Sequence, residues 1–85
     1  MATTATKPIK TFRLRGVKAS VFANQMEQGV YHKLTLQRIY RDGNEWKTTQ
    51  SLSRDDLPVA RLLLERAWEF ILETEANAHR NETDE

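Results

Sequence analysis

The stretch that decides the fold is residues 10–24, KTFRLRGVKASVFAN. Before Gly16, the apolar residues Phe12 and Leu14 occupy even positions. After Gly16, odd positions are apolar: Val17, Ala19, Val21 and Ala23. A two-residue Arg15-Gly16 turn between two antiparallel strands explains the change, because it places all these side chains on one face of a sheet. A bulge at Gly16 within one long strand is the alternative.

Two further strands are expected after this hairpin. Residues 30–40 are rich in β-branched and aromatic types and alternate between two faces. Asp42-Gly43 marks the next turn, and residues 45–52 form the fourth strand. Between the second and third strands we expect Ala19 to face Leu34, Val21 to face His32, and Phe22 to face Tyr31. In the fourth strand we expect four side chains to point toward the core: Trp46, Thr48, Gln50 and Leu52.

One amphipathic helix is predicted from about Ser53 to Thr74. Ser53 and Asp56 stand at capping-box spacing, with Asp55 as a competing N-cap. The apolar arc of this helix is about 180° wide, whereas packing on one sheet uses roughly 100°. The surplus predicts a homodimer with four contact residues on the helix: Val59, Leu63, Ala67 and Phe70. The alternative is that Trp68 or Phe70 merely covers an edge of the sheet.

These elements predict an α+β fold, a four-stranded antiparallel sheet followed by one C-terminal helix (ββββα). We expect a disordered arm over 1–8, one domain over 9–75 and a disordered acidic tail over 76–85. With 85 residues and no cysteine, the core of such a domain is marginal, which also favours a dimer. No stretch reaches the roughly 20 apolar residues of a membrane span, so we expect no membrane association and a cytoplasmic location.

The sequence predicts no catalytic site. The two histidines, His32 and His79, are far apart and lack a companion nucleophile or ligand cluster. The three glycines all fall at expected turns, so there is no phosphate-binding glycine loop. We therefore expect no enzyme activity, metal, cofactor or small-molecule substrate.

Charge is distributed unevenly along the chain. Residues 1–54 carry ten Lys and Arg against three Asp and Glu, and residues 55–85 carry three against nine. The predicted sheet face away from the helix combines cations with aromatic rings, as single-stranded DNA or RNA requires for phosphate contact and base stacking. The residues predicted to bind nucleic acid are Arg13, Arg15, Lys18, Phe22, Tyr31, Lys33 and Lys47.

Two alternatives to nucleic-acid binding follow from the same residues. The charged face can be an ordinary solvated surface, with Phe22 and Tyr31 as a cross-strand pair. The chain can also be a protein-interaction module or small regulatory subunit that docks through the apolar edge of the helix, with three anchors: Leu62, Trp68 and Phe70.

Residues 12–72 resemble a group of short, mostly uncharacterised bacterial proteins. The resemblance lies in six short segments: ASVFAN at 19–24, Gly29, RIY at 38–40, Asp42-Gly43, Trp46-Lys47 and DDL at 55–57. Over about 10–74, the order of elements also looks like the positive cofactor four and whirly class of single-stranded DNA-binding proteins. That resemblance implies a dimer formed by helices, and nucleic-acid contacts at Lys18, Phe22, Lys33 and Lys47.

Overall fold

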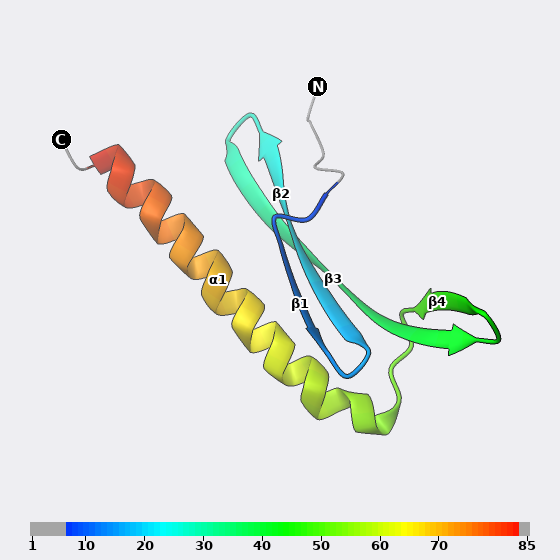
Figure 1. The fold of residues 1–85 in the computed structure, drawn as a ribbon. Coiled ribbons are helices and arrows are strands. Elements are labelled where there is room, and N and C mark those ends of the chain that lie inside the picture. Colours follow the sequence, from blue (N-terminus) through cyan, green and yellow to red (C-terminus); the bar gives the residue numbers. More distant parts are fainter. Residues whose placement is uncertain (1–6, 84–85) are drawn as a thin grey trace.

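The structure is a computed structural model that describes residues 7–83, and the side chains of residues 7–78. The predicted ββββα order is confirmed: four antiparallel strands are adjacent in chain order and one helix follows them (Figure 1). The elements are β1 (Lys10–Leu14), β2 (Val17–Met26), β3 (Gly29–Asp42), β4 (Glu45–Thr49), the short 3₁₀ helix η1 (Arg54–Asp56) and α1 (Leu57–Thr83). Most of the predicted N-terminal arm, residues 1–6, lies outside the described residues.

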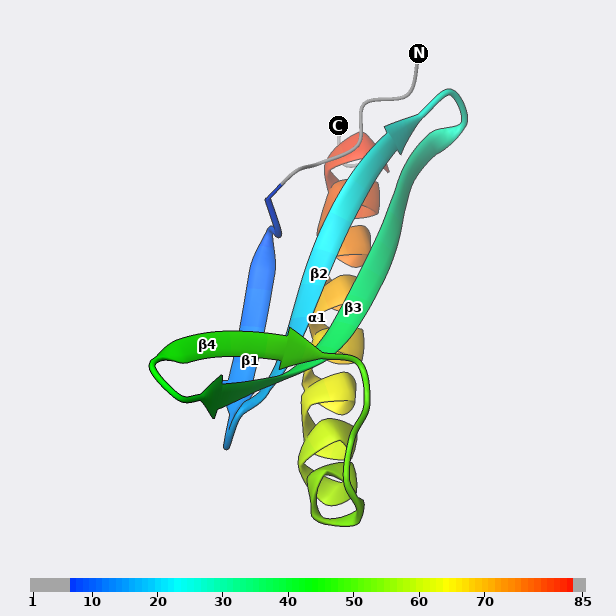
Figure 2. The same cartoon turned by 90° about the vertical axis from the view of Figure 1, so that its right-hand side faces the viewer.

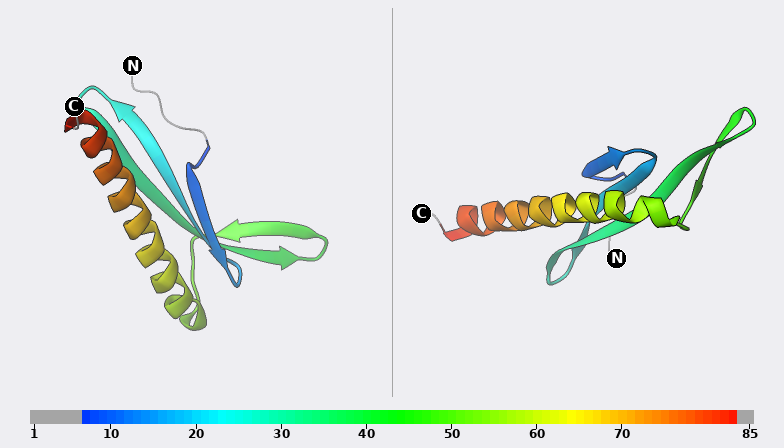
Figure 3. Two further views of the ribbon diagram at one scale, coloured as in Figure 1. Left: turned by 60° about the vertical axis from the view of Figure 1, so that its left-hand side comes forward. Right: turned by 90° about the horizontal axis from the view of Figure 1, so that it is seen from below.

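Two layers make up the molecule. The helix α1 lies across one face of the sheet and packs against β1 and β2 (Figures 1 and 2). The strand β3 is the longest, and its last residues pair with β4 in a hairpin that bends away from α1 (Figures 1 and 3). One face of the sheet is therefore covered by the helix and the other is open.

The first hairpin has the predicted register. Leu14 pairs with Val17 and Phe12 with Ala19, which excludes the bulge. Both turn residues have positive φ, 51° at Arg15 and 83° at Gly16, as a type I′ turn requires. A side chain at Gly16 would also place its Cβ 3.2 Å from the Ile39 carbonyl oxygen.

The predicted register between β2 and β3 is wrong by two residues. Ala19 faces Leu36 and Val21 faces Leu34, while Phe22 faces Lys33 instead of Tyr31. The reason is that β2 continues to Met26 and pairs there with Gly29. A two-residue turn therefore replaces the longer connection expected between a strand that ends at 24 and one that begins at 30. A shift of two residues leaves every side chain on its predicted face, because side chains alternate with a period of two.

The predicted faces of β4 are reversed. Lys47 pairs with Tyr40 and Trp46 with Arg41. By alternation along β3, Tyr40 shares the helix-side face with Leu36, whereas Arg41 shares the opposite face with Lys33. Lys47 therefore lies on the helix side and Trp46 on the open side. The strand also ends at Thr49, short of the predicted Leu52.

The core lies between the sheet and α1. Its buried apolar residues are Val17, Ala19, Val21, Ala60, Leu63 and Ala67. Around them pack half-buried side chains that include Phe12, Leu34, Leu36, Leu52 and Val59, and the ring of Phe70 meets that of Phe12 edge-on with 6.3 Å between centroids. The four residues predicted to form a dimer contact (Val59, Leu63, Ala67 and Phe70) therefore pack against the chain's own sheet or on its core.

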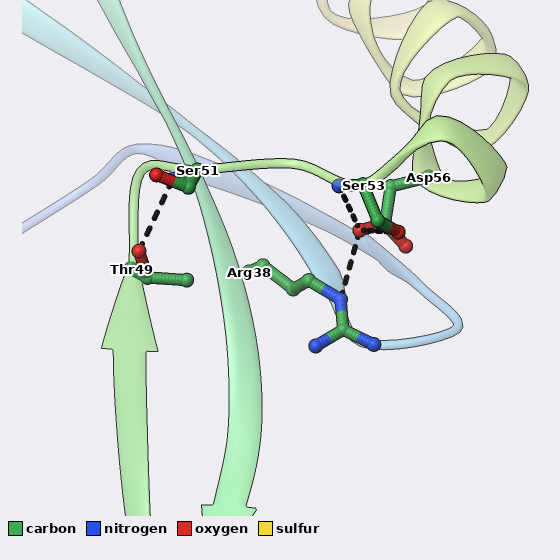
Figure 4. A network of polar contacts seen from close by, with 5 residues as sticks. All are labelled: Arg38, Thr49, Ser51, Ser53 and Asp56. Carbon is green, nitrogen blue, oxygen red and sulfur yellow. Dashed lines mark hydrogen bonds and ion pairs between the residues drawn. The ribbon is translucent and has the colours of Figure 1, made fainter.

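Polar contacts tie the start of the helix to β3. The Asp56 carboxylate accepts hydrogen bonds from the Ser53 backbone N–H (2.9 Å) and the Ser53 hydroxyl (3.0 Å), as the predicted capping spacing requires. The same oxygen forms an ion pair with Arg38 Nε at 2.9 Å (Figure 4). The Ser53 backbone N–H, then the Ser53 hydroxyl and Arg38, lower the pKa of Asp56 against the opposing effect of burial.

The helix is longer than predicted. We expected it to end near Thr74, but α1 continues to Thr83. The segment 75–83 contains neither glycine nor proline and includes two alanines, Ala76 and Ala78, so nothing in it breaks a helix. This segment continues the helix past the part that has a large apolar face, so it is polar. That polar composition is the reason why a disordered tail was predicted.

Replacing Leu63 should test the helix–sheet core. Leu63 is 2% exposed, so Leu63→Ala should lower the free energy of unfolding by about 2–4 kcal/mol through lost burial and a residual cavity. The matched control is Leu62→Ala, because Leu62 is its chain neighbour and is 36% exposed; its effect should stay within about 0.5 kcal/mol. Urea unfolding followed by circular dichroism measures both. Equal losses would contradict this packing.

The contacts of Asp56 predict a pH dependence. Because folding lowers its pKa below the ordinary 3.8, the ionised carboxylate stabilises the fold above that pH, and this stabilisation is lost as pH falls through the lower folded pKa. Asp56→Asn should therefore be less stable than the wild type at pH 7 and should lose less stability on acidification. The control is Asp55→Asn, since that side chain is 89% exposed. Parallel acid losses in the wild type and Asp56→Asn, measured by urea unfolding, would be evidence against this role.

Candidate nucleic-acid interface

The candidate site is the face of the sheet opposite α1, called the outer face. Cross-strand pairing places Arg13 beside Lys18, Ser20 beside Thr35, and Phe22 beside Lys33. Alternation assigns the following side chains of the four strands to this face: Thr11, Arg13, Lys18, Ser20, Phe22, Asn24, Met26, Tyr31, Lys33, Thr35, Gln37, Ile39, Arg41, Trp46 and Thr48.

The outer face has cations and, over the four strands, no carboxylates. Four of its side chains are basic: Arg13, Lys18, Lys33 and Arg41. None of the outer-face positions of the four strands is Asp or Glu, because Asp42 and Glu45 pair on the helix-side face and Glu27 lies in a turn. The local charge of the outer face is therefore positive although the whole chain is nearly neutral.

The helix side holds most of the basic residues that have a carboxylate partner. Arg38 is paired with Asp56 (2.9 Å). The ammonium group of Lys47 lies 3.0 Å from the Asp42 carboxylate. In the described part of the chain, Arg13, Lys18 and Lys33 have no such partner, so their charges are available to a ligand.

Aromatic rings accompany these cations. Phe22 is half-buried beside Lys33. Tyr31 lies near the start of β3 and is 50% exposed. Its hydroxyl donates a long hydrogen bond to Gln28 Oε1 (3.4 Å). The shift in register separates these two rings, so they do not form the expected cross-strand pair.

Trp46 lies on the side of the sheet opposite to the predicted one. It is 69% exposed, the most exposed of the large apolar side chains in the described residues. The guanidinium carbon of Arg41 lies 5.8 Å from its ring centroid, which is a cation–π distance. A signal for this placement is present in the sequence, because placing Trp46 inward also buries the polar residues Thr48 and Gln50.

Of the seven residues predicted to bind nucleic acid, the structure brings five onto the outer face: Arg13, Lys18, Phe22, Tyr31 and Lys33. Arg15 lies in the turn at the end of this face. Lys47 does not belong to it, because its register with Tyr40 turns it to the helix side. Compared with the predicted face, the observed outer face also contains Trp46 and Arg41 and does not contain Lys47.

The described residues show no sign of two other kinds of site. They contain no group of three His, Asp or Glu side chains placed to hold a metal ion. Within residues 7–83, α1 is too polar to cross a bilayer as a membrane-spanning helix.

Comparison of the chain with protein-family models, with curated protein sequences and with solved structures finds no match.

Proposed function

We propose that this chain is a non-enzymatic, cytoplasmic protein that binds single-stranded nucleic acid on its outer face, with little sequence preference, as a homodimer. One observation carries the proposal: the outer face combines basic side chains with exposed aromatic rings and has no carboxylate at any strand position. Such a face attracts a polyanion.

The form of the ligand follows from the rings. Cationic side chains neutralise phosphates of either a duplex or a single strand and release their counterions. Aromatic side chains gain about 1–3 kcal/mol per stacked base, but only where a base face is accessible. In a duplex these faces are hidden within the stack, so exposed Tyr31 and Trp46 favour an unpaired strand. Stacking does not discriminate strongly among bases, which accounts for the low sequence preference.

The homodimer is supported by an apolar edge of α1 that the sheet does not cover. Its residues are Leu57 (56% exposed), Leu64 (41%), Trp68 (59%) and Leu72 (44%). They recur at helical spacing along one line, next to the buried positions Ala60 and Ala67. This is the apolar surplus expected from the sequence, although different residues form it.

Charges beside this edge favour a second copy of the chain as its partner. Arg61 stands seven residues before Trp68, and Glu75 stands seven residues after it. The Glu75 side chain is half exposed, and its Oε2 also lies 3.1 Å from His32 Nδ1 of the same chain. In an antiparallel pair of helices related by a twofold axis at Trp68, Arg61 of one copy faces Glu75 of the other, and Leu64 faces Leu72. Each copy therefore supplies both the cation and the anion that the other needs.

The alternative function is that of a protein-interaction module whose different partner docks on the same apolar edge. Trp68 keeps its place as an anchor under this alternative. Phe70 does not, because it packs against Phe12, and Leu62 lies on another side of the helix. The oligomeric state of the isolated chain discriminates between the two possibilities.

Nucleic-acid binding can be tested by fluorescence anisotropy of a labelled oligo-dT strand at two or more salt concentrations, beside a duplex of equal length. Binding should favour the single strand and weaken as salt rises, with about 0.7 in the log–log slope for each phosphate contact. Lys33→Gln should reduce affinity and lower this slope by about 0.7, and Phe22→Ala should also reduce affinity.

The control is Lys47→Gln, which removes the same charge from the helix side and should leave the affinity and slope close to those of the wild type. A wild type that shows no binding at tens of micromolar, or a binding constant that does not respond to salt, would rule out this function. Equal losses for Lys33→Gln and Lys47→Gln would show that net charge matters and that the outer face does not.

The dimer can be tested by a charge exchange measured by sedimentation equilibrium. The wild type should be a dimer, and Arg61→Glu should weaken association because two carboxylates, the introduced one and that of Glu75, then face each other across the contact. The double variant Arg61→Glu with Glu75→Arg should recover association, because the pair is restored with its signs reversed. A monomeric wild type would favour the interaction module. An unrecovered double variant that melts like the wild type would exclude the antiparallel arrangement centred on Trp68; the melt is needed because Glu75→Arg also removes the carboxylate that lies 3.1 Å from His32.

A further inference from the structure

A hollow lies in the angle between two hairpins, at the end of the outer face. Its volume is about 420 Å³, within the range of roughly 300–1,000 Å³ that is usual for small-ligand sites. Residues of the β1–β2 hairpin line one side of it, and residues of the β3–β4 hairpin line the other. Figures 2 and 3 show the β3–β4 hairpin bending away from α1. The residues that line it are Arg13, Leu14, Arg15, Gly16, Val17, Ile39 and Trp46.

The two sides of the hollow are held at a fixed separation. The Ile39 backbone N–H donates a hydrogen bond of 2.7 Å to the Gly16 carbonyl oxygen, which joins the turn to β3 where β3 begins to pair with β4. The positive φ of Gly16 and its closeness to Ile39 leave little room for any other residue there. The hollow is thus part of the folded framework and needs no movement of a loop to form.

The lining has the chemistry of a nucleotide site. Trp46 offers a broad aromatic ring that is 69% exposed, with the Arg41 guanidinium 5.8 Å from its centroid. Arg13 and Arg15 offer guanidinium groups, which bind phosphate through two parallel hydrogen bonds. Among the described residues, no carboxylate lines the hollow, so none of its lining groups repels an anion. Ile39 adds an apolar surface against which the edge of a base can lie.

Arg15 is an unusual residue for its position. Its φ of 51° falls in the left-handed region, and the first central position of a type I′ turn is commonly Asn, Asp or Gly. A side chain such as arginine is less stable there, because its Cβ crowds the backbone. The turn would fold more readily with asparagine, so the requirements of the turn do not explain the arginine at this position.

We propose that the hollow is a subsite for one nucleotide of a bound single strand, with its base stacked on Trp46 and its phosphate held by Arg13 and Arg15. This inference rests on the proposed function and names the place on the outer face where a base is held most firmly. Of the remaining outer-face cations, Lys18 and Lys33 follow the rest of the strand toward Phe22.

The stacking part can be tested with Trp46→Ala and Trp46→Phe in the anisotropy assay on oligo-dT. Because Trp46 is largely exposed, both variants should fold as the wild type does, which a thermal melt checks. Trp46→Ala should weaken binding about 5- to 150-fold, the loss of one stacked base, and Trp46→Phe should recover most of it. On an oligonucleotide of abasic sites, Trp46→Ala and the wild type should bind alike.

The phosphate part can be tested with Arg15→Asn. This change should weaken binding several-fold at low salt, yet raise the midpoint of urea unfolding, because asparagine suits the left-handed conformation better. A residue that served only the turn would give unchanged binding. The opposite responses of binding and stability are therefore the signature of a ligand-binding role.

The outcomes separate this inference from the proposed function. If Lys33→Gln weakens binding while Trp46→Ala and Arg15→Asn do not, the hollow is not a subsite but the outer face still binds nucleic acid. If Trp46→Ala weakens binding to the abasic strand as strongly as to oligo-dT, stacking is not its role and the inference fails. If the wild type binds no single strand, both proposals fall together.

Discussion

The structure depends on the length of its turns. Each of the three hairpins closes with two residues, so that Leu14 pairs with Val17, Met26 with Gly29, and Asp42 with Glu45. Since side chains alternate strictly along a strand, each turn length decides which residues face α1 and which face water. One more residue in the Gly43-Asn44 turn would exchange the faces of β4 and return Trp46 to the helix side.

This constraint also separates the charges. The residues with carboxylates among the strands, Asp42 and Glu45, fall on the helix side together with Lys47 and Arg38. Over the four strands, the outer face keeps only cations and neutral groups. A chain that is nearly neutral overall thus presents one positive surface. The ion pair between Asp56, at the start of the helix, and Arg38 maintains this separation, because it holds the basic side chain of Arg38 away from that surface.

Much of the fold is predictable from local patterns, and the wrong predictions of register and strand face share a physical cause. The change of parity at Gly16 fixed the first hairpin, and Ser53 with Asp56 marked the helix start, because both are local features. The pairing of β2 with β3 and the faces of β4 depend on exact turn lengths, which polar turn residues do not reveal. The predicted face of Trp46 is wrong because an apolar residue in a strand usually indicates the core, whereas here the length of the turn before β4 decides the face.

The register of the sheet has a consequence for how the protein behaves when concentrated. The strand β4 pairs with β3 only from Arg38 onward, so residues 30–37 of β3 are paired with β2 on one side alone. Alternate backbone N–H and C=O groups along this segment lack a neighbouring strand within the described part of the chain. An unpaired edge of this length is a template for strands of other molecules. This edge of β3 is therefore one place where unwanted aggregation during expression can begin, and Lys33, a charged residue in its middle, opposes it.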